Sequence, residues 1–73
     1  MSRAVLGVLR KASEPLSTVE AANRLADAKG VDAADKQAMR LLTKRVGMTL
    51  SHQRAKGTVR NQPGLDGKGL WVV

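Results

Sequence analysis

The sequence predicts an α+β fold, mostly helical, in a single domain spanning residues 1–73. Three segments carry apolar residues at helical spacing, and proline or glycine separates them. After the third segment the pattern changes to two short runs rich in β-branched or aromatic residues, joined by a glycine-rich stretch. We therefore expect three helices followed by a C-terminal β-hairpin, around a small core.

The first helix is predicted over residues 3–12, with Ser2 as its N-cap. Val5 and Leu9 recur at helical spacing and give it an apolar face. Gly7 lies inside this helix and costs about 1 kcal/mol relative to alanine, unless another element packs closely against it. Pro15 ends the segment, because the residue before a proline avoids the helical region.

The second helix is predicted over residues 18–29, after Leu16 in an extended conformation. Ser17 and Glu20 have the spacing of a capping box, in which each side chain bonds the other residue's backbone amide. Gly30 supplies the left-handed residue that ends the helix. The expected buried face consists of Val19, Ala22, Leu25 and Ala26.

The third helix is predicted over residues 36–56 and ends at Gly57. Either Asp32 or Asp35 can be its N-cap. At about 100° per residue, two stripes separate on this helix. The apolar stripe consists of Met39, Leu42, Val46 and Leu50. The basic stripe consists of Lys36, Arg40, Lys44, Gly47, Ser51 and Arg54.

The positive charge of the chain is concentrated in and just after this helix. Residues 36–60 contain seven Lys or Arg and no Asp or Glu, whereas the other residues carry six basic and six acidic side chains. The whole formal charge of +7 therefore lies in about a third of the chain. Such segregation favours binding to a polyanion, and the competing interpretation is a solvated helix face.

The hairpin is predicted over residues 58–73, with strands near 58–62 and 70–73 and a turn over 63–69. Val59 and Trp71 are expected to face inward and to pair across the hairpin. Trp71 is the only aromatic residue, so bases cannot be stacked on a row of rings.

Several function classes have no support in the sequence. The absence of cysteine predicts a reducing, cytoplasmic compartment, and no apolar run is long enough to predict a membrane span. His52 is the only histidine and the carboxylates are scattered, which predicts neither a metal site nor an enzyme. We expect no cofactor, and no small-molecule effector pocket is evident.

The order of elements resembles the winged helix-turn-helix family of DNA-binding domains, over almost the whole chain. The residues that carry the resemblance are Pro15-Leu16-Ser17-Thr18, Leu25-Ala26, Arg54-Ala55-Lys56-Gly57, and Val59 with Trp71. The resemblance implies that the third helix enters the major groove of double-stranded DNA. It also implies that the start of the second helix faces a phosphate and that the hairpin, the wing, touches the DNA backbone or the minor groove. The segment between the second and third helices is longer than in a minimal helix-turn-helix.

These implied roles give a set of candidate DNA-binding residues. Base contacts are expected from Lys36, Gln37, Arg40 and Lys44, and phosphate contacts from Ser51 and Arg54. Thr18 is the candidate at the second helix, where capping alone also explains the residues. Arg60 and Lys68 are the candidates on the wing, with solvated charge as the alternative. Gly47 either permits a close backbone approach or is a weak point of the helix.

The leading hypothesis is a cytoplasmic, nucleoid-associated transcriptional regulator that binds double-stranded DNA in a sequence-specific or semi-specific way. The alternative is a winged-helix protein-interaction module or a subunit of a larger assembly, which docks on a protein partner or a second copy of itself through Leu41 and Met48, on a third stripe of the long helix. Non-specific architectural binding and RNA binding are further alternatives.

Overall fold

The fold consists of three helices and a two-stranded antiparallel hairpin, as expected from the sequence. The computed structural model describes residues 2–32, 34–64 and 69–73. Helix α1 spans Ser2–Lys11, α2 spans Thr18–Lys29 and α3 spans Lys36–Ala55. Strand β1 spans Arg60–Pro63 and β2 spans Gly69–Val72. The class is α+β, mostly α, and the layout is consistent with a winged helix.

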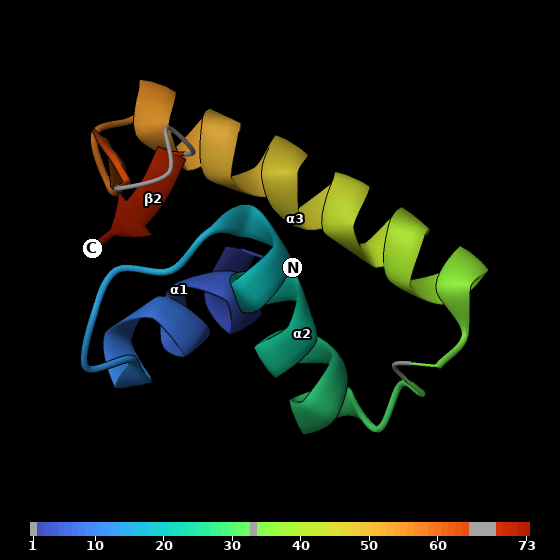
Figure 1. Cartoon of the computed structure of the whole chain (residues 1–73). Coiled ribbons are helices and arrows are strands. Elements are labelled where there is room, and N and C mark those ends of the chain that lie inside the picture. Colours follow the sequence, from blue (N-terminus) through green and yellow to red (C-terminus); the bar gives the residue numbers. More distant parts are fainter. Residues whose placement is uncertain (1, 33, 65–68) are drawn as a thin grey trace.

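Helix α3 runs along one side of the molecule, with α1 and α2 packed beneath it and the hairpin at its C-terminal end (Figure 1). The core between these elements is built from aliphatic side chains and Trp71. Its fully buried large members come from every part of the fold except the strands: Val5, Leu16, Leu25, Val46, Leu50 and Val59. The apolar stripe of α3 therefore faces the core as predicted, with Met39 and Leu42 partly buried at its N-terminal half.

Helix α2 begins and ends where its cap residues predicted. The Ser17 hydroxyl accepts a hydrogen bond from the Glu20 amide at 3.1 Å, and Gly30 adopts the left-handed conformation with φ of 74°. The second half of the capping box differs, because the Glu20 carboxylate accepts from the Ser17 hydroxyl at 3.2 Å. The prediction that Val19 is buried was wrong: Val19 is exposed, and Ala21 is buried in its place, because α2 packs between α1 and α3 and turns that side inward.

The two candidate N-caps of α3 have different roles. Asp35 is the N-cap, and its carboxylate accepts from the Ala38 amide at 3.1 Å. Asp32 accepts instead from the Ala34 amide at 2.9 Å, two residues along, which organises the turn before the helix. At the other end Gly57 is left-handed, with φ of 81°, and the Thr58 amide bonds to the Gln53 carbonyl. This closing bond is the Schellman pattern of a helix C-terminus.

Helix α1 departs from prediction at its N-terminus, because Ser2 lies inside α1 and does not precede it as a cap. Among the described residues, none packs closely on Gly7, since a Cβ built there would meet nothing within 4 Å. Of the two cases considered for Gly7, this is the one in which glycine costs stability relative to alanine.

The hairpin register also differs from the predicted one. Trp71 pairs with Asn61, and Val59 lies before β1 although it is buried. The strand begins later than residue 58 because the Thr58 amide is hydrogen-bonded to the C-terminal end of α3. On its other side Trp71 forms a β-bridge with Leu16, through backbone bonds of 2.7 and 3.2 Å. The short extended segment before α2 thereby joins the hairpin.

Candidate nucleic-acid interface

The basic stripe forms an exposed face along one side of α3. Its cations and hydroxyl all lie on the surface, at Lys36, Arg40, Lys44, Ser51 and Arg54. Helix α3 carries no acidic residue between its first and last positions, so no carboxylate of the helix itself neutralises this face. The structure thus brings five of the predicted residues onto one continuous surface.

The N-terminus of α2 lies beside the middle of this stripe. A Cβ built at Gly47 would lie 3.5 Å from Cγ2 of Thr18. The neighbour that approaches Gly47 is therefore the first residue of α2. This contact places the α2 N-terminus, with the positive end of its helix dipole, beside the basic stripe of α3.

Thr18 connects three elements. Its hydroxyl accepts a hydrogen bond from the indole Nε1 of Trp71 at 2.9 Å, so the start of α2 is tied to β2 as well as to α3. Because the hydroxyl accepts in this bond, it keeps its own proton to donate to another acceptor. A phosphate oxygen is one such acceptor.

A shallow groove of about 680 Å³ follows these contacts across the surface. Residues of the basic stripe, of the α2 N-terminus and of the hairpin line this groove. The lining residues are Thr18, Thr43, Lys44, Gly47, Met48, Ser51, His52 and Trp71. The predicted DNA-binding residues Thr18, Lys44 and Ser51 therefore line a common surface.

Two further candidate DNA-binding residues are described by the structure, and neither lines this groove. Gln37 is exposed in the first turn of α3, next to Lys36. Arg60 is exposed at the start of β1, opposite Val72. Lys68 lies outside the described residues, as does most of the predicted turn of the hairpin.

Leu41 and Met48 occupy the part of α3 that points away from the core. Their side chains are 59 and 65% exposed, although both are large and apolar. At about 100° per residue the two point in nearly the same direction, almost opposite Val46. Arg40 and Lys44 lie to one side of this pair and Arg45 to the other, and all three cations are exposed.

One buried residue and one hydrogen bond near the interface were not found from the sequence. Gln53 is buried on the core side of α3, with 7% of its surface exposed. The hydrogen bond between Trp71 and Thr18 joins residues 53 positions apart, so no local sequence pattern predicts it. The one available signal was that a buried indole N–H generally has a hydrogen-bond acceptor.

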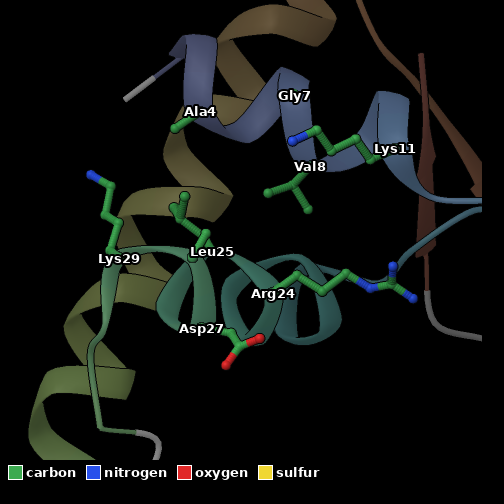
Figure 2. A pocket seen from close by; sticks show the side chains of 9 residues that line it. Ala4, Gly7, Val8, Lys11, Arg24, Leu25, Asp27 and Lys29 are labelled. Atoms are coloured by element: carbon green, nitrogen blue, oxygen red, sulfur yellow. The ribbon is translucent and has the colours of Figure 1, made fainter.

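A second hollow, of about 470 Å³, lies between α1 and α2 (Figure 2). The sequence had indicated no such pocket. Val8 and Leu25 face each other across it, and Lys11 and Lys29 lie on either side of them in Figure 2. No residue of α3 lines this hollow, so it is separate from the basic stripe.

Within residues 2–32, 34–64 and 69–73, no group of three or more metal-binding side chains comes together. None of the helices over these residues has the length and apolar character needed to cross a membrane.

Comparisons of the chain with protein-family models, with curated proteins and with solved structures found no match.

Proposed function

We propose that this protein is a small winged helix-turn-helix domain that binds double-stranded DNA and regulates transcription in the cytoplasm, associated with the nucleoid. The observation that carries the proposal is the exposed basic stripe of α3, beside the N-terminus of α2 and continuous with the groove that reaches the hairpin. Cations and helix-terminal amides on one face suit a phosphate backbone.

In this proposal α3 lies in the major groove. An α-helix with its side chains is about 10–12 Å wide and the major groove is about 12 Å wide, so the two fit. Lys36, Gln37, Arg40 and Lys44 would then reach base edges, and Ser51 and Arg54 would meet phosphates.

The α2 N-terminus would hold a further phosphate through its amides and the Thr18 hydroxyl, whose proton remains available beside Trp71. Arg60 and Lys68 would contact the backbone from the wing. One chain of this size reads few base pairs, and two copies on neighbouring half-sites would read more.

Paired charge deletions test the proposal. The variant Arg40→Ala with Lys44→Ala removes two cations from the basic stripe. The matched control, Lys11→Ala with Lys29→Ala, removes the same charge from the hollow between α1 and α2. All four side chains are exposed, so both variants should fold like the parent protein, as checked by circular dichroism and thermal melting.

Binding to a fluorescein-labelled duplex of mixed sequence, measured by anisotropy, should separate the two variants. The stripe variant should bind at least about tenfold more weakly, because it loses two base contacts that are each worth about 1–3 kcal/mol. The control should retain nearly the affinity of the parent protein. Equal weakening in both variants would mean that net charge alone attracts DNA, and would overturn the assigned interface.

The exposure of Leu41 and Met48 favours a second candidate, a winged-helix module that binds a protein partner or a second copy of the chain. Under this alternative, Leu41→Asp with Met48→Asp abolishes association in sedimentation measurements, and the stripe variant leaves association intact. Under the DNA-binding proposal, the parent protein binds duplex whether or not it self-associates.

A further inference from the structure

Leu41 and Met48 are exposed on α3, beside the basic stripe that the proposed function directs at DNA. They are seven positions apart, which on a helix is about two turns and about 10 Å along the axis. Their side chains therefore present two apolar contacts on one line, pointing away from the core.

The surroundings of this pair narrow the choice of partner. Arg40 and Lys44 lie on one side and Arg45 on the other, so cations border the apolar pair on both edges of the helix. A second copy of the chain docked face to face would set these cations against one another, because α3 has no acidic residue. The favoured occupant carries negative charge along two edges and an apolar group between them.

The major groove of DNA has this arrangement. Its two edges are phosphate backbones, its floor carries base acceptors within reach of cations such as Arg40 and Lys44, and the one apolar group exposed on that floor is the C5-methyl of thymine. We infer that Leu41 and Met48 contact thymine methyl groups, so that the protein prefers sites with thymines about two to three base pairs apart. This inference rests on the proposed function and adds a specificity to it.

The spacing follows from the helix geometry. About 10 Å of helix corresponds to about three steps of 3.4 Å in the duplex, and fewer where the helix lies inclined to the duplex axis. A buried methyl group contributes roughly a fourfold change in affinity, and two contribute about fifteenfold.

The experiment compares two duplexes of about 20 base pairs that differ only in the C5-methyl group. One has alternating adenine and thymine, and the other has the same sequence with deoxyuridine in place of thymidine. The parent protein should bind the thymine duplex about four- to fifteenfold more tightly, as measured by competition against a labelled duplex. A second comparison uses two duplexes of G·C pairs, one with cytosine and the other with 5-methylcytosine. The parent protein should again bind the methylated duplex more tightly.

The variant Leu41→Ala with Met48→Ala should bind both adenine-containing duplexes with similar affinity. Val73→Ala is the matched control, because it shortens an exposed aliphatic side chain at the end of the hairpin. This control should retain the parent's preference for thymine.

Each result decides a separate question. Equal binding of the thymine and uracil duplexes by the parent protein, or a preference that survives in the double variant, overturns the thymine contact and leaves the proposed function standing. No binding to any duplex by the folded protein overturns both. In that case, binding of an acidic amphipathic helical peptide would instead assign the Leu41 and Met48 surface to a protein partner.

Discussion

The bond between Trp71 and Thr18 provides a direct test of how the hairpin is attached to the helices. Replacing Thr18 with valine removes the hydroxyl that accepts from the indole Nε1. Valine retains the methyl group that lies against Gly47, so the packing between α2 and α3 is preserved. The substitution therefore isolates the hydrogen bond.

The expected loss of stability is large for a chain of this size. Trp71 is 8% exposed and its bond to Thr18 is partly buried, so loss of the acceptor should cost about 1–3 kcal/mol. For a domain of this length the total free energy of unfolding is about 4–11 kcal/mol. The melting temperature should fall by roughly 5–20 °C.

Equilibrium unfolding in urea measures this effect. Trp71 is the only aromatic residue, so its fluorescence reports on the hairpin, while circular dichroism at 222 nm reports on the helices. The matched control is Thr58→Val at an exposed position, expected to change stability by less than about 0.5 kcal/mol. If Thr18→Val and the control unfold at the same urea concentration, the bond does not stabilise the fold and the reasoning is refuted.

Substitutions at three further positions test the helix geometry by the same unfolding measurement. Gly7→Ala should stabilise the protein by up to about 1 kcal/mol, because a Cβ at this helical position meets open space; destabilisation would show that the position is not free. Gly57→Ala should instead destabilise the protein by about 1 kcal/mol, because the residue has φ of 81°; an unchanged midpoint of urea unfolding would argue against the left-handed cap. Asp35→Ala should cost about 1 kcal/mol through loss of the N-cap bond to Ala38, and Asp35→Asn should recover most of it. Equal stability of these two Asp35 variants would contradict the cap assignment.

Local chemistry was sufficient to predict the helices and the apolar side of α3. Helix α2 begins after Ser17 and ends before Gly30, as predicted, because capping depends on atoms within one turn of the chain. The separation of apolar and basic stripes on α3 follows from helix geometry alone, and the exposure of the basic residues agrees with it.

Features set by contacts between distant residues could not be read from the sequence in the same way. The hairpin register depends on Trp71, which is fixed by Leu16 on one side and by Thr18 through its indole. The buried arc of α2 depends on both helices that pack against it, which is why Val19 is exposed. The proximity of Thr18 and Gly47, which brings the α2 N-terminus to the basic stripe, likewise arises only in the folded chain.

The salt dependence of duplex binding tests the central proposal most directly. A labelled mixed-sequence duplex would be titrated with the parent protein at several salt concentrations and followed by fluorescence anisotropy. Contacts to about five phosphates predict a slope of log affinity against log salt near −4 to −5. No binding at low salt, from protein that melts cooperatively, would contradict the proposal and identify the basic stripe as a solvated face.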